Sequence, residues 1–260
     1  MQKWIAALSL CFACASPTRV AREAAPGEAP LTLLTYNVNY GLAGDAPGIA
    51  AIAVTDADIV LLQETNPEWE AELRAALGER YPHIYFHHVG AAGGSAVLSK
   101  YPLTQLDVVG HPVKGSWFPT MVAVVDTPQG EVQLANVHLR PPLSDSGNPI
   151  LGFFTTSDVR RAEMRNILKR LNRDLPTIVA GDFNESSGGA LGVLQEAGFE
   201  NGGEAFGVDR DTWRWNTSVG EIGSRLDHVV YDGRIDPLQI EVVEAGRSDH
   251  LPVVARIVVR

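Results

Sequence analysis

The sequence predicts an α+β fold in which two β-sheets pack face to face and helices cover their outer faces. Three observations carry this prediction. The first two are that many short apolar or β-branched runs end at Gly, Pro or Asp, and that only a few segments show helical periodicity. The third is the composition, 260 residues that are 45% hydrophobic and 20% charged, which suits one domain with a sizeable core. Sheets and helices that each bury one face assemble in such layers.

Strands are predicted where an apolar or β-branched run is closed by a turn residue. In chain order they cover Leu31–Val38, Ile59–Gln63, Ile84–His88, Ala96–Ser99, Gln105–Val109, Met121–Asp126, Val132–His138, Thr177–Ala180, His228–Tyr231 and Val253–Val259. Between two of these runs, residues 127–130 read Thr-Pro-Gln-Gly, which is typical of a tight hairpin turn. The patterns leave the strand order within the sheets open.

Helices are predicted in three places. The first begins at Asn66, which is followed by a proline, and ends before Gly78. The second is capped by Ser157 or Asp158 and continues with apolar residues at the i, i+3, i+4, i+7 spacing of one helix face. The third covers Gly189–Ala197.

The N-terminal residues have the pattern of an export signal. Lys3 supplies a positive charge, residues 4–13 are apolar, and residues 13–15 (Ala-Cys-Ala) offer a cleavage site. We therefore expect residues 1–15 to be the signal peptide of an exported protein, periplasmic or extracellular. Residues 16–30 are expected to be a flexible tether and residues 31–260 one domain. Lipidation of Cys11 or Cys14 is the alternative, and it would produce a lipid-anchored surface protein.

Cysteine use and charge limit the classes of partner. Both cysteines lie in the N-terminal segment, so the mature domain has none with which to form an internal disulfide. No later apolar run approaches the roughly 18 residues of a membrane span. The net charge of −10 argues against sequence-blind wrapping of nucleic acid, which needs a basic face, but it leaves room for a local basic groove. A monomer is expected.

Polar and acidic side chains recur at or just past the ends of the predicted strands. Each has an ordinary explanation when taken alone: a turn residue, an acid at a helix start, or a core histidine. Their recurrence at strand ends along the whole chain indicates instead a site built on a rigid scaffold. The residues are Asn37, Glu64, His138, Asp182, Asn184, Asp227, Asp249 and His250.

Several of these residues lie in motifs that resemble one enzyme superfamily. The motifs are residues 35–39 (Thr-Tyr-Asn-Val-Asn), 62–64 (Leu-Gln-Glu), 96–103 (Ala-Val-Leu-Ser-Lys-Tyr-Pro-Leu), 181–184 (Gly-Asp-Phe-Asn), 225–228 (Arg-Leu-Asp-His) and 248–250 (Ser-Asp-His). The sequence resembles the endonuclease/exonuclease/phosphatase superfamily, which includes pancreatic-type deoxyribonucleases, abasic-site endonucleases, neutral sphingomyelinases and inositol-phosphate phosphatases. The resemblance implies a four-layer α/β/β/α sandwich of two mostly antiparallel sheets, with the site at one end. It also implies a metal-dependent hydrolase of phosphoric ester bonds.

Oxygen donors among these residues suit a divalent metal. Glu64 and Asp249 are hard carboxylate donors, and Asn37 adds an amide oxygen. Neither cysteine nor an HExxH helix is present in the domain to build a zinc site. Mg²⁺ is therefore the expected cofactor, with Mn²⁺ or Ca²⁺ as alternatives, and it would polarise the phosphoryl group of a phosphodiester.

His250 is the candidate general base, because an imidazole titrates near the working pH. The resemblance implies that Asp227 is its carboxylate partner. It further implies that Asp182 positions the attacking water or handles the leaving-group proton, while Asn184 and His138 donate hydrogen bonds to the phosphate oxygens. Whether Asp182 or His250 removes the proton stays open at this point.

The substrate is less well defined by the sequence. Arg140 would bind phosphate through its guanidinium, and Trp213 would stack on bases, although a surface arginine and a core tryptophan are the ordinary alternatives. Asn39 stands where abasic-site enzymes tend to carry a second acidic residue, which disfavours that subclass. A nuclease is expected. The alternatives are the same chemistry on a phospholipid or small phosphate ester, favoured by the apolar segment 148–156 and the negative charge, and a non-catalytic binding module.

Overall fold

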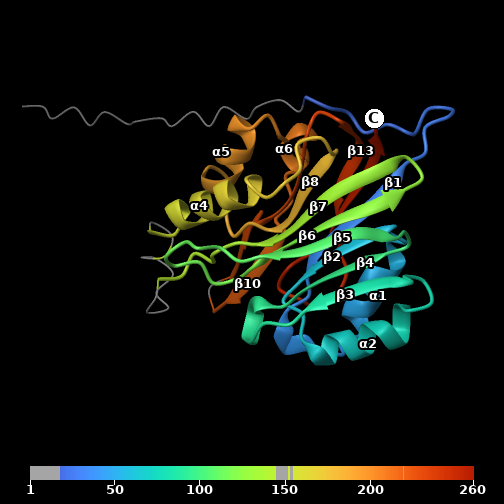
Figure 1. Ribbon diagram of the computed structural model, residues 1–260. Helices are drawn as coiled ribbons and strands as arrows, with labels where there is room; N and C mark the ends of the chain where they lie inside the picture. Colours follow the sequence, from blue (N-terminus) through green and yellow to red (C-terminus); the bar gives the residue numbers. More distant parts are fainter. Residues whose placement is uncertain (1–17, 145–151, 153–154, 219) are drawn as a thin grey trace, which may run out of the picture.

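The computed structural model describes residues 18–144, 152, 155–218 and 220–260 (Figure 1). The predicted signal at residues 1–15 and most of the apolar segment 148–156 lie outside the described residues. Within the described part of the chain, no helix is both long and apolar enough to cross a membrane.

Two six-stranded sheets form the centre of the fold. The first sheet has the order β13-β14-β1-β2-β4-β3, and the second has the order β5-β6-β7-β8-β12-β9. The first contains β1 (Leu31–Asn37), β2 (Ile59–Gln63), β3 (His83–His87), β4 (Ser95–Ser99), β13 (Ile235–Val242) and β14 (Val253–Val259). The second contains β5 (Leu103–Val109), β6 (Thr120–Thr127), β7 (Gly130–His138), β8 (Thr177–Asp182), β9 (Glu200–Asn201) and β12 (Asp227–Tyr231).

One parallel strand pair lies at the middle of each sheet. Among the described strands, β1 and β2 are the parallel pair of the first sheet, and β7 and β8 are that of the second; the other pairings are antiparallel. Parallel strands end at the same edge of their sheet, so the residues that follow β1 and β2 are neighbours, as are those that end β7 and β8.

Helices cover the outer face of each sheet and complete four layers (Figure 1). The first sheet is covered by α1 (Ala46–Val54) and α2 (Pro67–Leu77), the second by α4 (Ser157–Leu168) and α5 (Gly189–Glu196). The short helices are α6 (Gly202–Ala205), η1 (Tyr40–Leu42) and η2 (Ala91–Gly93). The predicted α/β/β/α sandwich of mostly antiparallel sheets is therefore confirmed.

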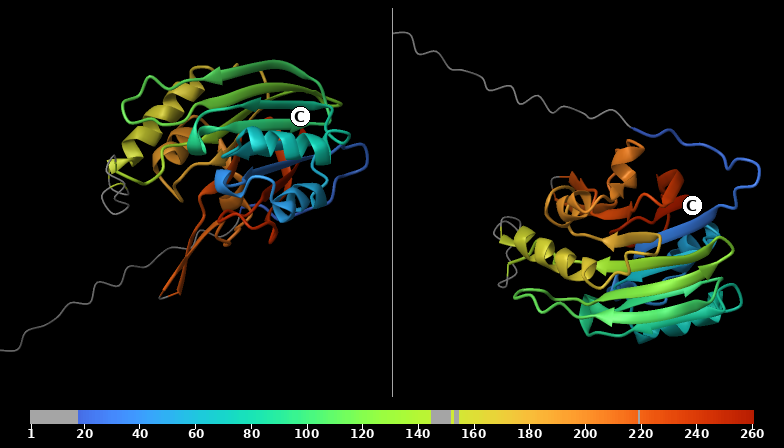
Figure 2. Two further views of the ribbon diagram at one scale, coloured as in Figure 1. Left: turned by 90° about the horizontal axis from the view of Figure 1, so that it is seen from below. Right: turned by 45° about the horizontal axis from the view of Figure 1, so that its top comes forward.

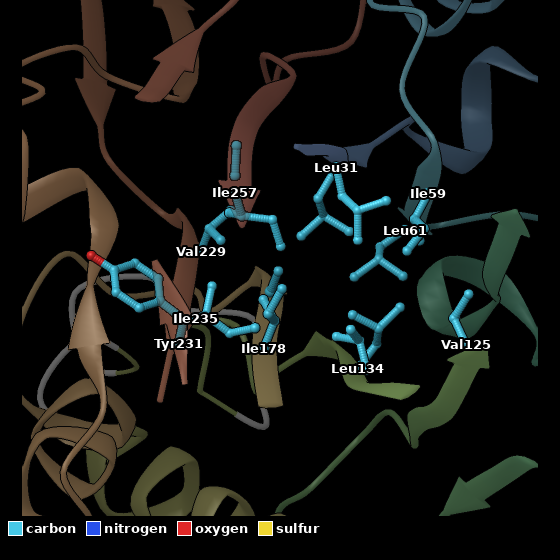
Figure 3. Packing of buried hydrophobic residues seen from close by; sticks show 14 of the residues in the cluster. Leu31, Ile59, Leu61, Val125, Leu134, Ile178, Val229, Tyr231, Ile235 and Ile257 are labelled. Carbon is cyan, nitrogen blue, oxygen red and sulfur yellow. The ribbon is translucent and has the colours of Figure 1, made fainter. Parts of the chain in front are cut away.

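The core between the sheets is built from alternate residues of the central strands. Leu31 and Leu61 of the first sheet face Leu134 and Ile178 of the second (Figure 3). The intervening residues point outward, where Leu62 packs with Trp69 of α2 and its neighbours. Because successive side chains of a strand point to opposite faces and both faces are covered here, the central strands are mostly apolar.

The start of α2 and the turn between β6 and β7 agree with the prediction, whereas the start of α4 does not. Asn66 caps α2 by accepting a hydrogen bond from the backbone of Trp69, and residues 127–130 form the predicted hairpin turn between β6 and β7. The predicted caps Ser157 and Asp158 are wrong: the N-cap of α4 is Thr156, whose side chain does not cap the helix, because its hydroxyl donates backwards to Gly152.

Elements that the sequence did not predict have weak patterns. The edge strand β13 contains Pro237 beside a shift in pairing register, and a proline inside a run argues against a strand. Helix α1 carries Pro47 and Gly48, and because it has no polar residues it lacks the 3.6-residue periodicity that marks an amphipathic helix. The hairpin of β10 (Trp213–Thr217) and β11 (Gly220–Ser224) forms its own two-stranded sheet and projects from the body (Figure 2, left).

The residues that precede β1 run along the domain. The backbone of Arg19 donates to Ala205, and its guanidinium pairs with Glu200. Arg22 pairs with Asp236 of β13. This part of the predicted tether therefore lies against the sandwich. It leads to the start of β1, where Leu31 pairs with Ile257 near the C-terminus.

Candidate active site

The side chains predicted to form a site come together at one end of the sandwich. In the second sheet, the ends of β7 and β8 and the start of β12 place His138 beside Asp182 and Asp182 beside Asp227. In the first sheet, Asn37 ends β1 next to Gln63, and Glu64 follows. The Asn37 amide joins the two sheets, because its Nδ2 lies 3.1 Å from Glu64 Oε1 and 3.2 Å from Asp182 Oδ2.

His250 is held between two buried carboxylates. Its Nδ1 lies 2.8 Å from Asp227 Oδ2, and its Nε2 lies 3.7 Å from Asp182 Oδ2. Burial alone would lower the pKa of His250, but the negative charges of Asp227 and Asp182 outweigh burial and raise that pKa to about 10. The two carboxylates therefore favour the form of His250 that carries a proton on both ring nitrogens.

Thr212 fixes the carboxylate of Asp227. The Thr212 hydroxyl accepts hydrogen bonds from the backbone N–H groups of Leu226 and Asp227, each at 2.9 Å. Its own hydrogen is thereby directed to Asp227 Oδ2 at 2.7 Å. Because the Thr212 oxygen already accepts two hydrogen bonds, its hydroxyl acts as a donor and holds Asp227 Oδ2, the oxygen that faces His250, in place.

Asp182 lies at the centre of the buried polar group. Burial raises its pKa, while the neighbouring His250 and His138 act in the opposite direction. The Nε2 of His138 lies 3.5 Å from Asp182 Oδ2, and burial lowers the pKa of His138. Asn184 donates its backbone N–H to Asp182 Oδ1 at 2.8 Å and its side-chain amide to the carbonyl of Leu139 at 3.1 Å.

The predicted metal ligands gather oxygen atoms beside this group. Glu64 is half-buried, and burial raises its pKa. Asp249 is exposed, and its two oxygens accept hydrogen bonds from Asn39 Nδ2 at 3.0 Å and Trp213 Nε1 at 3.1 Å. Among the residues that the structure describes, neither lysine nor arginine pairs with Glu64 or Asp249. Carboxylates without a lysine or arginine partner suit a hard divalent ion, so Glu64 and Asp249 fit one. The Oδ1 of Asn37, the third predicted ligand, accepts a hydrogen bond from the backbone N–H of Asn39 at 3.1 Å.

A second group of ligand atoms meets the geometric requirement for a metal. The ligand atoms of Asp182, Asp227 and His250 all lie within 4.8 Å of one another. In this group His250 Nδ1 and the hydroxyl of Thr212 already engage Asp227 Oδ2. The arrangement is that of a hydrogen-bonded histidine with its carboxylate, which is a different chemistry from the oxygen donors around Glu64.

Three residues at the strand ends have an unusual backbone conformation. Asn39, Glu64 and Asn184 have positive φ angles of 61°, 60° and 53°. Residues other than glycine rarely adopt this left-handed backbone conformation, and glutamate adopts it less often than asparagine does. Such conformations concentrate at functional sites, where surrounding contacts hold them. Here the carboxylate of Glu64 is held by Asn37 and by the backbone N–H of Tyr40.

The two residues predicted to bind substrate lie at different depths. Trp213 is half-buried. Its backbone forms an antiparallel β-bridge with that of His250, and its indole N–H donates a hydrogen bond to Asp249. Arg140 is buried: its guanidinium donates to the carbonyl of Leu143 at 2.7 Å and lies over the ring of Trp117, 3.4 Å from the centroid. The prediction that Arg140 binds phosphate stays untested.

Three residues that support the site were not predicted from the sequence. Thr212 orients Asp227, and Phe118 stacks on His138 with ring centroids 4.2 Å apart and planes at 25°. Ser248 donates to the carbonyl of Asn37 at 2.8 Å and so attaches the loop of His250 to the end of β1. Ser248 could have been found from its place in the Ser-Asp-His motif, whereas Thr212 and Phe118 lie in segments without a recognisable pattern.

Comparisons with known proteins show the family to which the chain belongs. A model of the endonuclease/exonuclease/phosphatase family matches residues 34–250. No curated protein matches the sequence. Among solved structures, an endonuclease/exonuclease/phosphatase from Beutenbergia cavernae DSM 12333 is 21% identical with a TM-score of 0.65, covering 88% of this chain and 72% of that one.

Two further solved structures share the fold. TDP2 from D. rerio, complexed with a single strand DNA product, is 17% identical with a TM-score of 0.65 and covers 88% of this chain and 99% of that one. A functionally unknown conserved protein from Enterococcus faecalis V583 is 19% identical with a TM-score of 0.66, covering 88% and 100%. Identities this low establish a common fold and nothing finer.

Proposed function

We propose that this chain cleaves the phosphodiester bonds of nucleic acid. It belongs to the endonuclease/exonuclease/phosphatase family and is therefore a hydrolase of phosphoric esters. The observation that carries the proposal is the hydrogen-bonded pair of Asp227 and His250, placed beside Asp182 and His138 at the joined ends of the two sheets. The DNA product bound to the D. rerio protein of the same fold supports nucleic acid as the substrate.

The charges of the site divide the chemical roles. His250 holds its proton because two carboxylates raise its pKa to about 10, so we assign it to donate a hydrogen bond to the phosphate. Asp182 is a carboxylate whose pKa is raised by burial, which makes it a better proton acceptor than an exposed aspartate. We therefore assign Asp182 to take the proton of the attacking water. Asn184 and His138 would position the phosphate oxygens.

Glu64, Asn37 and Asp249 would hold the divalent ion. The family depends on divalent metals, and these three side chains supply the oxygen donors that Mg²⁺ prefers, with Mn²⁺ and Ca²⁺ as alternatives. A bound ion would polarise the phosphoryl group and offset its negative charge. The Asn39 and Trp213 side chains orient Asp249 for this purpose through one hydrogen bond to each of its oxygens.

A phospholipid or small phosphate ester is the second candidate substrate. Trp215 is 56% exposed and Ile222 is 50% exposed, and the two are directly opposite each other in the projecting β10–β11 hairpin (Figure 2, left). Adjacent apolar side chains on a projecting hairpin favour contact with an apolar partner.

Export is a separate part of the proposal. The sequence of residues 1–15 supports a signal peptide, with lipidation as the alternative. Fractionation of cells that express the full chain tests it: an exported protein appears in the periplasm or medium, a lipidated one with the membranes, and a cytoplasmic protein would refute export. Size-exclusion chromatography with light scattering tests the expected monomer.

The hydrolase proposal is tested with bis-p-nitrophenyl phosphate, with and without Mg²⁺ or Mn²⁺ and after EDTA. We expect metal-dependent turnover that Asp182→Asn abolishes and that the exposed control Asp174→Asn retains. A panel of single-stranded DNA, duplex DNA, RNA and sphingomyelin vesicles then separates the two candidate substrates. Turnover of vesicles without turnover of nucleic acid would refute the nuclease, and turnover unaffected by EDTA would refute the metal.

A further inference from the structure

Helix α4 carries a buried carboxylate that the roles above do not use. The Glu163 side chain is inaccessible to solvent, and burial raises its pKa. Its Oε1 accepts a hydrogen bond from the Ser116 hydroxyl at 2.5 Å, and its Oε2 accepts one from the backbone N–H of Arg140 at 3.0 Å. Glu163 thus connects α4 to two other segments, one before β6 and one after β7.

Both of these segments lead to His138. Phe118, two residues after Ser116, stacks on the imidazole of His138. Arg140 is two residues after His138, and its guanidinium lies over the ring of Trp117. The two oxygens of Glu163 therefore hold the chain on each side of the Phe118–His138 stack.

The stack is one of three contacts that orient the His138 ring, beside Asp182 and the backbone of Ala92. The distance of 3.5 Å from His138 Nε2 to Asp182 Oδ2 is longer than an ordinary N–H···O hydrogen bond. A nearly parallel contact at 4.2 Å between ring centroids restricts the tilt of the imidazole. Displacement of the Phe118 segment would release this restriction.

We propose that Glu163 is a positioning residue, which orients the His138 ring toward the phosphate in the transition state by holding the Ser116–Phe118 segment against the Arg140 backbone. The inference rests on the proposed function of His138. A carboxylate supplies what an isosteric amide does not, two acceptor oxygens for two donors. In Glu163→Gln the backbone N–H of Arg140 can keep an oxygen acceptor, but Ser116 would exchange its 2.5 Å bond to a carboxylate for a weaker, neutral one in which its hydroxyl accepts from the amide nitrogen.

The test compares steady-state hydrolysis of bis-p-nitrophenyl phosphate by the wild type, Glu163→Gln and Ser116→Ala. Because misplacement of a catalytic group by about 1 Å can reduce the rate 10²-fold, we expect kcat to fall about 10- to 100-fold in Glu163→Gln. We expect KM to stay within about threefold, since His138 acts mainly in the transition state. Ser116→Ala, which leaves α4 untouched, should show a smaller fall of the same kind. Glu196→Gln, an exposed carboxamide change on α5, is the matched control.

The double variant Glu163→Gln/His138→Ala distinguishes positioning from general loss of structure. If Glu163 acts through His138, the Glu163 change should have no further effect on kcat in the His138→Ala background. A full, multiplicative loss there would overturn the proposal, as would wild-type kcat in both Glu163→Gln and Ser116→Ala.

A readout that needs no turnover separates this inference from the proposed function. The fluorescence of Trp117, obtained by subtracting the spectrum of the matching Trp117→Phe protein, should change in Glu163→Gln and Ser116→Ala if the segment is released. An inactive wild type would refute the hydrolase function alone. An unchanged Trp117 spectrum in both variants would refute the role of Glu163.

Discussion

Removal of the Asp227 charge is the most direct perturbation of the candidate site. Asp227→Asn keeps the size of the side chain and retains one oxygen that can accept hydrogen bonds. In the wild type, Asp227 Oδ2 accepts from the Thr212 hydroxyl at 2.7 Å and lies 2.8 Å from His250 Nδ1. The change therefore removes charge while it preserves shape. We predict that it lowers the pKa of His250, changes the pH dependence of the free energy of unfolding and reduces turnover.

The magnitude follows from the hydrogen bond and the charge. A hydrogen bond to an ionised group contributes about 1.5–3 kcal/mol, against about 1 kcal/mol between neutral groups. A change of one in pKa corresponds to about 1.36 kcal/mol, so weakening of this hydrogen bond alone should lower the pKa of His250 by about 0.4–1.5, and loss of the Asp227 charge adds to that fall. The remaining charge of Asp182, 3.7 Å from Nε2, should keep that pKa from falling as far as burial alone would take it.

The assay is a proton NMR titration of the histidine ring signals in EDTA, with the His250 signal identified by its absence in His250→Asn. Stability gives a second measurement. A folded-state pKa of about 10 against 6.5 in the unfolded chain means that protonated His250 stabilises the fold fully below pH 6.5, and that this contribution is lost as pH rises toward 10. The decline in unfolding free energy over that range should be shallower in Asp227→Asn.

Turnover of Asp227→Asn should fall about 10²-fold or more, which is the usual contribution of a positioned proton donor or acceptor. Thr212→Ser, which keeps the hydroxyl that orients Asp227, is the matched control and should retain activity. An Asp227→Asn protein with the His250 pKa and the kcat of the wild type would refute the electrostatic account of this pair.

Three further changes test the metal site, a buried histidine and the core. Glu64→Gln should weaken Mn²⁺ binding measured by calorimetry at least tenfold, because it removes one of the charges that hold the ion; unchanged affinity would exclude Glu64 as a ligand. Burial lowers the pKa of His228 to about 4, so the unfolded chain takes up a proton below pH 6.5 that the folded protein refuses, and the unfolding free energy should fall as pH decreases from 6.5 to 4. His228 should account for about 2 kcal/mol of the loss at pH 5 relative to pH 7, and the loss should be smaller by that amount in His228→Gln, as followed by urea unfolding at each pH. Leu61→Ala, between the sheets, should cost about 2–5 kcal/mol in the same assay, whereas Ile222→Ala on the exposed hairpin should be nearly silent.

The fold was predictable to the extent that burial leaves a pattern. Strands β2 and β14 lie at the residues predicted, because both are apolar runs with clear ends. The β10–β11 hairpin was missed because it lies outside both sheets and its residues are mostly polar or exposed. Strand order was not predictable, since it depends on contacts between distant segments.

Parts of the site followed from the sequence for a physical reason. His138 and Asp182 end adjacent parallel strands, so a pattern of polar residues after apolar runs was enough to place them together. Phe118 and Thr212 contribute through tertiary contacts, and an aromatic or a hydroxyl in a loop has many equivalent explanations. The proton on His250 could not be inferred either, because it results from two carboxylates that are distant in sequence.

The pairing of Leu31 with Ile257 has a practical consequence for how the protein can be handled. Strand β1 runs from that pair to Asn37, and at about 3.3 Å per residue it separates the two ends of the sandwich by about 20 Å. A purification tag, a surface linker or a fluorescent domain joined before β1 or after β14 would emerge at the far end from Asn37. The molecule can therefore be immobilised by either flank with the end that carries the candidate site turned outward, where a polymer or a vesicle could reach it.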